Sequence, residues 1–509
     1  MNRKLILLGL IGLLSFSFCQ ARENLLEQFK NKEAIIYTIN IRNFGAIDKD
    51  NDGIIGENDV KGTFLNAKDR LKDLAQEGIN TIYLLPITKT GKIKALGTAG
   101  SLYAMDSFSE IAPELDDVKN PMSVADEAKV FVKTAHSLNM NVIVDLPCCG
   151  SYDLCLSKPD LFVQDEDNNP VVPADWTDVR LFKTVDEDNN LDKEIIKNFK
   201  NFVDMVQDLE IDGIRADVAA IKPPEFWAEI IKYAKEKNPN FVFLAEASPD
   251  WDNPAKNYIK HYSTIDELLD SGFDSYYGSF SDFKNIKTKQ EFDEKIEKNL
   301  KILKNHKDKS MISALATHDQ QAPILRGKNY WNMVLWLSTT LPLNTYFLDG
   351  FSTGDSFSYP FENKKAAKTY TDDDFYYVHS GMFDIFNFSR APMGNFVYLK
   401  KQYIKAIKFK TSNIDLFKYG TYKPVKTEND KVFGYTMTYQ NKELLVVGSL
   451  DDKENQKATI KLASLKKDHL FSVINSLTSA KSTKGFLNLT FEPLELKVFL
   501  ITSTIPQED

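Results

Sequence analysis

Cysteine is scarce in this chain. Four cysteines occur among 509 residues, at positions 19, 148, 149 and 155. No paired cysteine spacing and no cluster of the six histidines accompanies them, so the sequence offers no ligand set for a structural zinc ion. Beyond Cys19 an odd number of cysteines remains, so one thiol is expected to stay free.

Long basic runs are also lacking. The chain has 63 Lys and Arg residues against 72 Asp and Glu residues, which gives a formal net charge of -9. A nucleic-acid partner needs clustered positive charge to neutralise phosphates, so this balance argues against such a partner. A neutral or cationic ligand remains open.

Long hydrophobic runs are missing except at the start of the chain. A cationic Met1–Lys4 precedes an apolar stretch over Leu5–Phe18 and then Cys19–Ala21. This order predicts a signal peptide over 1–21, cleaved before Arg22, and hence a secreted or periplasmic protein. Lipid anchoring through Cys19 is the alternative, which the bulky Phe18 disfavours. No later segment reaches the roughly 18 apolar residues of a spanning helix, so no membrane span is expected.

After the leader, short β-rich runs alternate with amphipathic stretches, the pattern of repeated βα units. The strand-like runs are Ala34–Ile39, Thr81–Leu85, Asn141–Asp145, Gly213–Asp217, Phe241–Ala245, Met311–Ala316 and Leu343–Leu348, with a weaker one at Gly272–Tyr276. The helix-like stretches are Lys68–Ala75, Ser123–Leu138, Lys193–Val206, Pro224–Lys237, Gln290–Leu303 and Asn329–Leu337. Such a series predicts an α/β fold, either a closed (β/α)8 TIM barrel or an open doubly wound sheet.

Two further segments complete the domain organisation. The polar, aperiodic residues 146–192 form an excursion between the third strand and the third helix. After Lys410 the chain turns to alternating runs such as Val432–Tyr439, Glu443–Leu450 and Leu494–Ile501. We therefore expect a barrel over 22–410 and a C-terminal antiparallel β-sandwich domain over 411–509.

Three acidic residues decide between the two α/β folds. Asp217 ends one strand-like run, Glu246 directly follows another, and Asp319 follows Met311–Ala316. A closed barrel gathers the carboxyl ends of several strands around one site, whereas an open sheet uses mainly one switch point. The TIM barrel is therefore favoured, although any one of these acids taken alone would more simply cap the next helix.

Convergent carboxyl groups suit the cleavage of a glycosidic bond with retention. That reaction needs an ionised carboxylate as nucleophile, a protonated carboxyl to assist the leaving oxygen, and stabilisation of a cationic transition state. The three acids could supply these three roles.

Together the segments resemble the α-amylase superfamily, glycoside hydrolase family 13. The signature residues stand in Gly213-Ile214-Arg215-Ala216-Asp217, in Phe243-Leu244-Ala245-Glu246 and in Ala314-Leu315-Ala316-Thr317-His318-Asp319. Residues 36–42, 158–161 and 175–179 are similar to further family segments, so the resemblance runs from about Ala34 to the C-terminus.

The resemblance implies a role for each motif residue. Asp217 would be the nucleophile, Glu246 the general acid/base and Asp319 the transition-state stabiliser. Arg215, on the same face of its strand as Asp217, would hold the nucleophile ionised. For substrate binding, His318 would donate to sugar hydroxyls, and Tyr103, in Gly100-Ser101-Leu102-Tyr103, would stack on a sugar ring.

Several family positions are changed in this chain. Cys149 and Gly150 stand where the family usually has Asn and His, Ser107 replaces an Asp, and Ala220-Ile221 replaces a Lys-His pair. These changes put the usual calcium site in doubt. They also predict weaker substrate binding, which the double substitution Cys149→Asn, Gly150→His would restore.

A separate calcium loop is predicted after the first strand. The run from Asp48 to Asp59 matches an EF-hand-like loop with a glycine at its sixth position. Its ligands would be Asp48, Asp50, Asp52, Ile54 through its carbonyl, and Asp59. A solvated acidic turn is the alternative.

These observations predict an exported retaining α-glycosidase that hydrolyses α-glucosidic bonds in malto-oligosaccharides or starch-like glucans. A transglycosylase or disaccharide-specific enzyme would use the same acids, and a degenerate carbohydrate-binding homologue would keep the fold. Calcium is the one cofactor expected, with no organic cofactor. The sequence predicts no oligomeric state.

Overall fold

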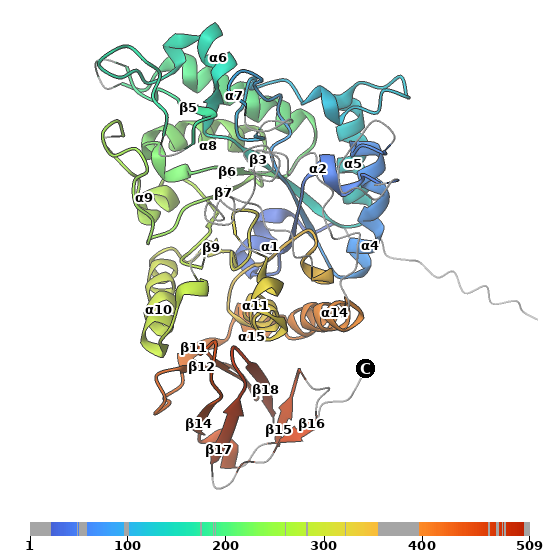
Figure 1. Cartoon of the computed structure of the whole chain (residues 1–509), viewed down its shortest axis with the longest axis vertical. Coiled ribbons are helices and arrows are strands. Elements are labelled where there is room, and N and C mark those ends of the chain that lie inside the picture. Colours follow the sequence, from blue (N-terminus) through green and yellow to red (C-terminus); the bar gives the residue numbers. More distant parts are fainter. Residues whose placement is uncertain are drawn as a thin grey trace, which may run out of the picture.

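The structure is a computed structural model, and it leaves the predicted signal peptide with Cys19 outside the described residues. It describes residues 22–47, 49, 59–95, 101–173, 176–186, 188, 190–259, 261–280, 283–320, 322–354, 396–466, 469–474, 478–480, 482 and 485–502. In Figure 1 the barrel occupies the larger part of the molecule, and a smaller β-sheet region lies beyond helices α11 and α14.

Eight parallel strands form the barrel. They are β1 Ile35–Ile39, β2 Thr81–Leu84, β3 Asn141–Leu146, β6 Gly213–Ala216, β7 Val242–Ala245, β8 Ser275–Tyr276, β9 Ser310–Met311 and β10 Thr345–Leu348. They pair in the order β10-β1-β2-β3-β6-β7-β8-β9. A parallel bridge between Ile312 and Asn344 joins the two ends of this order, so the sheet closes. The predicted TIM barrel is confirmed, and the open sheet is excluded.

Helices surround the strands where the amphipathic pattern predicted them. They are α4 Leu71–Gln76, α5 Val124–Ser137, α7 Lys193–Asp208, α8 Pro224–Lys237, α10 Lys289–Asn305 and α11 Lys328–Thr340. Side-chain caps fix several of their starts: Ser123 caps α5, Asp192 caps α7, and Thr288 forms a capping box with Glu291 on α10. Shorter helices are α2 Ile41–Phe44, α3 Phe64–Ala67, α6 Tyr152–Ser157, α9 Ile265–Asp270 and α15 Ile414–Lys418.

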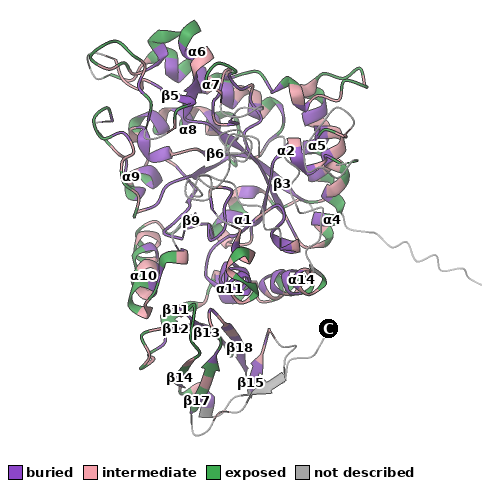
Figure 2. Ribbon diagram, viewed as in Figure 1, coloured by how far each residue is buried: buried purple, intermediate pink, exposed green. Residues whose placement is uncertain are grey.

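The strands are buried on both faces, as Figure 2 shows for β3, β6 and β9. Parallel strands covered by helices bury both faces, which explains their continuous apolar runs. Helix α1 (Leu25–Asn31) closes the amino-terminal end of the barrel. Its Leu25 and Phe29 pack into the barrel interior, and the side-chain oxygen Oε1 of Gln28 accepts hydrogen bonds from Asn141 and Thr81 at the starts of two strands.

The excursion after β3 has a short hairpin of its own. Strand β4 (Cys149–Ser151) pairs antiparallel with β5 (Val179–Leu181). Gly150 lies opposite Arg180 in this ladder, and a Cβ atom at Gly150 would come within 2.7 Å of the rings of Phe162 and Phe182. The expected gain from Gly150→His is therefore wrong, because the two rings occupy the space that any side chain there would need.

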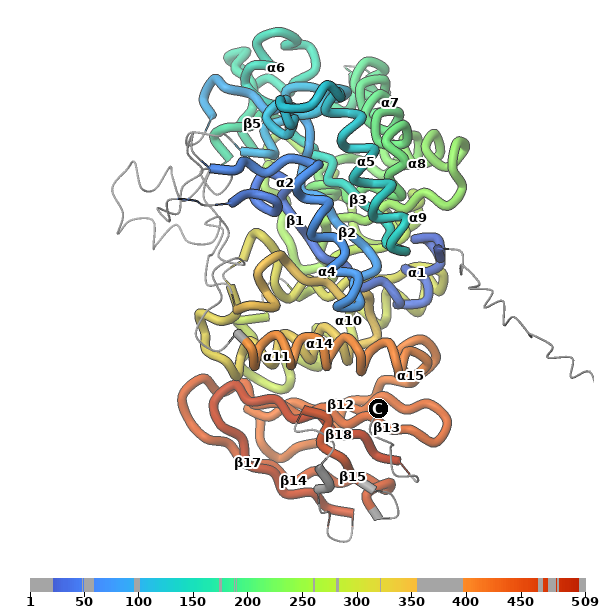
Figure 3. The backbone as a smooth tube through the Cα atoms, turned by 90° about the vertical axis from the view of Figure 1, so that its right-hand side faces the viewer, coloured from blue at the N-terminus to red at the C-terminus, as the bar shows by residue number. Residues whose placement is uncertain are grey.

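The C-terminal region is an antiparallel β domain, as predicted. Helix α14 runs from Phe396 to Ser412, and the first strand follows α15. One sheet has the order β11-β12-β13-β18-β15-β16, and β14 pairs with β17. The strands are β11 Thr421–Pro424, β12 Val432–Tyr439, β13 Lys442–Ser449, β14 Gln456–Lys461, β15 His469–Ser472, β16 Thr478–Ala480, β17 Phe486–Phe491 and β18 Leu496–Thr502. Helices α11 and α14 lie between this domain and the barrel strands in both views (Figures 1 and 3).

In the described part of the chain, no helix is long and apolar enough to cross a membrane. Cys148, Cys149 and Cys155 are all buried and free of disulfide bonds.

Candidate active site

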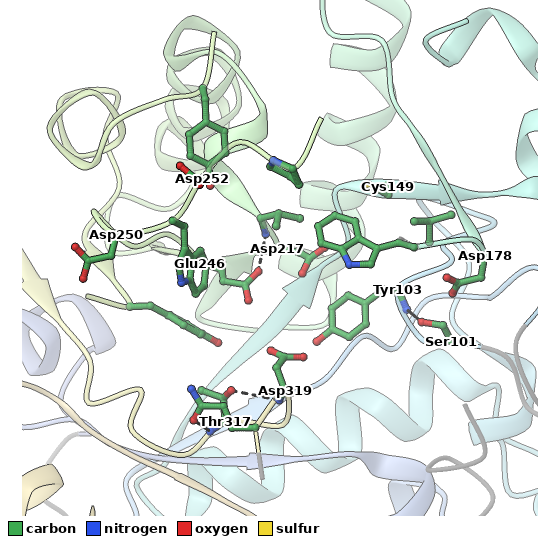
Figure 4. Close-up of a pocket in the computed structure, with 18 residues that line it drawn as sticks. Ser101, Tyr103, Cys149, Asp178, Asp217, Glu246, Asp250, Asp252, Thr317 and Asp319 are labelled. Carbon is green, nitrogen blue, oxygen red and sulfur yellow. Dashed lines mark hydrogen bonds between the residues drawn. The ribbon is translucent and has the colours of Figure 1, made fainter. Parts of the chain in front are cut away.

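The three predicted acids line one pocket at the carboxyl end of the barrel (Figure 4). Asp217 directly follows β6, Glu246 directly follows β7, and Asp319 lies on the segment beyond β9. The pocket has a volume of about 490 Å³, within the roughly 300–1,000 Å³ of ligand-binding pockets. The barrel thus brings together carboxyl groups that are up to 102 residues apart, from position 217 to position 319.

Arg215 lies beneath this pocket and contacts three carboxyl groups. Its side chain is fully buried, and its Nη1 atom donates to Asp145 and Asp217, each at 2.8 Å. Its Nη2 atom lies 2.6 Å from Oε1 of Glu246. Arg215 therefore contacts the predicted acid/base as well as the predicted nucleophile, whereas the spacing in the sequence pointed to Asp217 alone.

The turn after Asp217 is held by Glu246. The backbone N–H of Val218 donates to Oε2 of Glu246 at 2.7 Å, and the N–H of Ala219 donates to the Glu246 carbonyl at 3.1 Å. Val218 has φ 37°, in the left-handed region that a β-branched residue rarely adopts. These two hydrogen bonds help to hold a strained backbone beside the predicted nucleophile.

Burial raises the pKa values of Asp217 and Asp319. The pKa of Asp217 is raised well above its usual value by burial and by the neighbouring Glu246, while Arg215 opposes the rise. Burial also raises the pKa of Asp319 to about 6, although 37% of its side chain stays exposed. Arg215 opposes the rise in the pKa of Asp217, as expected from its position two residues earlier in the sequence, but burial outweighs it.

Tyr103 and His318 form a stacked pair at the edge of the pocket. Their ring centroids are 5.7 Å apart, and the Tyr103 hydroxyl lies 2.6 Å from Nε2 of His318. The hydroxyl donates its proton to Asp145 at 2.8 Å, so His318 must donate from Nε2 to the hydroxyl oxygen. Burial lowers the pKa of His318 to about 4, which keeps the ring neutral. Tyr103 lines the pocket, whereas the ring of His318 is buried behind Tyr103.

Several pocket residues were not singled out from the sequence. Trp176 and Asp178 come from the excursion, and Trp251 and Tyr262 come from the segment after β7. Asp178 is 5% exposed, and its carboxylate accepts a hydrogen bond from Ser101. Asp178 belongs to a segment that resembles the family, but its place in the pocket depends on how the excursion folds back.

The predicted calcium loop lies largely outside the described residues, which include only Lys49 and Asp59 of its twelve positions. The Asp59 carboxylate accepts the backbone N–H of Lys49 at 2.8 Å. Just outside the loop, Ile47 and Val60 form an antiparallel bridge. Among the residues that the structure describes, no group of three or more His, Cys, Asp or Glu side chains could hold a metal ion.

Comparison with curated proteins gives matches over part of the chain. An α-1,4-glucan:maltose-1-phosphate maltosyltransferase of Bifidobacterium animalis subsp. lactis is 30% identical over 203 residues, covering 37% of this chain and 27% of that protein. The α-amylase MalA of Haloarcula japonica is 27% identical over 256 residues, covering 48% and 32%. The matched regions thus span about a third or less of these relatives. No protein-family model matches the chain.

Comparison with solved structures covers nearly the whole chain. An α-amylase from Lactobacillus plantarum superposes with a TM-score of 0.68 at 19% identity, covering 92% of this chain and 99% of that one. The maltogenic α-amylase AmyB of Thermotoga neapolitana gives a TM-score of 0.65 at 21% identity, covering 94% and 100%. This chain therefore has the fold of these α-amylases, and the resemblance predicted from its motifs is confirmed at the level of the fold.

Proposed function

We propose that this chain is a retaining α-glycosidase that hydrolyses α-glucosidic bonds in malto-oligosaccharides or starch-like glucans. The observation that carries the proposal is the contact of one buried guanidinium, that of Arg215, with both Asp217 and Glu246. The two curated relatives are named for reactions on α-glucans, which supports an enzyme of the same substrate class.

The proposed chemistry divides the reaction between two carboxyl groups. Asp217 attacks the anomeric carbon while Glu246 gives a proton to the leaving oxygen, and water then displaces Asp217 with Glu246 as base. Two inversions give net retention. Asp319 faces the same pocket and stabilises the positive charge that develops on the sugar.

Aromatic side chains in the pocket suit a sugar substrate. Trp176, Trp251, Tyr262 and Tyr103 offer flat faces on which the apolar face of a pyranose can pack. Asp178 and Ser101 add polar groups on the excursion side, where sugar hydroxyls can form hydrogen bonds.

A second candidate function is transfer of a glycosyl group from a sugar phosphate, the reaction for which one curated relative is named. The charged side chains that line the pocket among the described residues are all acidic: Asp178, Asp217, Glu246, Asp250, Asp252 and Asp319. Lys295 and Lys298 nearby both pair with Asp250, at 2.9 and 2.7 Å. A phosphate dianion would meet repulsion here, so a neutral donor is favoured.

A substrate panel tests these alternatives. The purified mature chain should release smaller sugars from maltotriose or starch in a screen that also contains maltose, isomaltose, trehalose and sucrose, with products separated by chromatography. Maltose 1-phosphate should remain unchanged. Release of inorganic phosphate would favour the glycosyl-phosphate reaction, products longer than the substrate would favour transglycosylation, and no turnover of any substrate would favour a carbohydrate-binding homologue.

We further propose that the chain is exported with its leader removed before Arg22. The cationic start, apolar stretch and small residues at 19 and 21 support this processing. Arg22 then remains in the mature chain, where it pairs with Asp212 at 2.9 Å. Mass spectrometry of the mature protein should find Arg22 at its N-terminus, and a lipid-modified Cys19 would contradict this cleavage.

We also propose that the loop from Asp48 to Asp59 binds one calcium ion. The bridge between Ile47 and Val60 supports this proposal, because it holds the two ends of the loop together. A glycine at the sixth position permits the sharp turn that brings loop carboxylates around one cation.

Calcium at a hundred times its dissociation constant should stabilise the fold by about 2.7 kcal/mol, because the ion binds the folded state alone. Differential scanning calorimetry should therefore show a higher Tm with calcium, and the Asp50→Ala, Asp52→Ala double variant should lose the increase. Magnesium at the same concentration is the control. A calorimetric titration that detects no calcium binding would exclude the site.

A further inference from the structure

Lys222 is a fully buried lysine close behind the predicted nucleophile. It follows the short 3-10 helix η4 (Ala219–Ile221), five positions after Asp217. Its Nζ atom donates to the backbone carbonyl of Cys148 at 3.0 Å, in the loop after β3. Three aromatic rings surround the ammonium at 5.2–5.5 Å, those of Phe182, Phe199 and Phe226.

Burial of an ammonium group in such surroundings is costly unless a partner compensates its charge. The dipole of α8 gives no compensation, because that helix starts at Pro224 and its amino-terminal end is positive. The neighbouring thiols are not anions, since burial raises the pKa of Cys148 well above its usual value and that of Cys149 to about 12. Burial lowers the pKa of Lys222, and among the groups whose charge opposes that lowering Asp217 is the carboxyl group.

The backbone around Lys222 is tied to other elements by hydrogen bonds. Ser263 donates its N–H to the Ala220 carbonyl and its hydroxyl to the Lys222 carbonyl, each at 2.8 Å. The side chain of Lys222 adds the link to the loop after β3, where Cys149 lines the pocket. The segment that follows Asp217 is thus held through its backbone, by Ser263, and through the side chain of Lys222.

We propose that Lys222 is a positioning residue, which ties the segment after Asp217 to the loop after β3 and supplies a second buried positive charge for the Asp217 carboxylate. Arg215 on β6 contacts Asp217 directly and also contacts Asp145 and Glu246. Lys222 acts on Asp217 from the other end of the turn that follows the strand. The inference rests on the proposed function, in which Asp217 is the nucleophile.

Lys222→Met tests the role, and Lys410→Met is a matched control. Lys410 is also fully buried and also donates to a backbone carbonyl, that of Leu343 at 2.9 Å, but it lies on α14. Lys222→Met should lower kcat by about tenfold with little change in KM, because the nucleophile is displaced while the sugar contacts remain. Lys410→Met should lower the Tm and leave kcat within about twofold of the original value.

A double-mutant cycle tests the charge coupling without any activity assay. At pH 7, Lys222→Met should lower the Tm less in a chain that already carries Asp217→Asn than in the original chain. The amide of that variant is neutral, so loss of the lysine charge removes no attraction there. Equal losses of Tm in both backgrounds, or an unchanged kcat, would overturn the proposal. If Lys222→Met fails to fold, Lys222→Gln takes its place in the same cycle. If the original chain acts on no substrate, the proposed function fails while the cycle still decides the role of Lys222.

Discussion

Asp217→Asn should abolish turnover of every substrate, by at least about ten-thousandfold in kcat. The amide is nearly the same size as the carboxylate but cannot attack the anomeric carbon. The fold should persist, because the substitution removes a buried carboxyl whose pKa is already raised by burial and by Glu246. Activity assays on maltotriose and on an aryl α-maltoside, with Tm as the folding control, check this result.

Glu246→Gln should act differently on the two substrates. An aryl leaving group needs little protonation, so the first step should proceed on the aryl α-maltoside while turnover of maltotriose is lost. A burst of released aryl alcohol would show that the covalent intermediate forms and then persists. Proton NMR during early turnover by the unaltered chain should detect α-configured sugar. A β-configured product would contradict the retaining mechanism.

Arg215→Met should cause the second large loss, about a thousandfold in kcat/KM. The substitution leaves Asp145, Asp217 and Glu246 without their shared cation, and both Asp145 and Arg215 have fully buried side chains. Removing one partner of a buried pair costs about 3–5 kcal/mol, so the free energy of unfolding in urea should fall by that order. Arg215→Lys should recover only part of the lost stability. A lysine restores the positive charge, but one ammonium group cannot reach all three carboxylates.

The stability loss of Arg215→Met should depend on pH. Without the guanidinium, the pKa of Asp217 in the folded state rises further above its value of 3.8 in the unfolded chain. A group with a raised folded-state pKa favours folding at low pH, and that contribution is lost as the pH rises through the folded-state pKa. Urea unfolding should therefore show a smaller loss at pH 4 than at pH 7. An equal loss at both pH values, or kcat/KM within tenfold of the original, would contradict this role for Arg215.

Much of the barrel could be predicted because its signals are local. Continuous apolar runs mark strands buried on both faces, and β1, β2, β3, β6, β7 and β10 all lie within or beside the predicted runs. The runs at Gly272–Tyr276 and Met311–Ala316 were less exact. The first run contains the two residues of β8, whereas β9 starts one residue before the second run, which contains only its Met311. The apolar pattern reports burial, whereas a strand requires paired backbone hydrogen bonds.

The short helices α1 and α2 show the limit of local patterns. Seven and four residues are too few for the helical period to be read from apolar spacing, and neither helix was predicted. Helix α1 is stabilised by tertiary contacts, since Leu25 and Phe29 pack inside the barrel and Gln28 reaches two strands.

The sequence by itself determined the closed barrel and placed Asp217, Glu246 and Asp319 at one end of it, because parallel strands of a barrel must all end on the same side. Only the tertiary structure decided how these acids are held. The contact of Arg215 with Glu246, the stacking of Tyr103 on His318 and the crowding of Gly150 by Phe162 and Phe182 join residues distant in the sequence. Such contacts leave no periodic signal in the chain, since they depend on how the loops after several strands fold over a shared pocket.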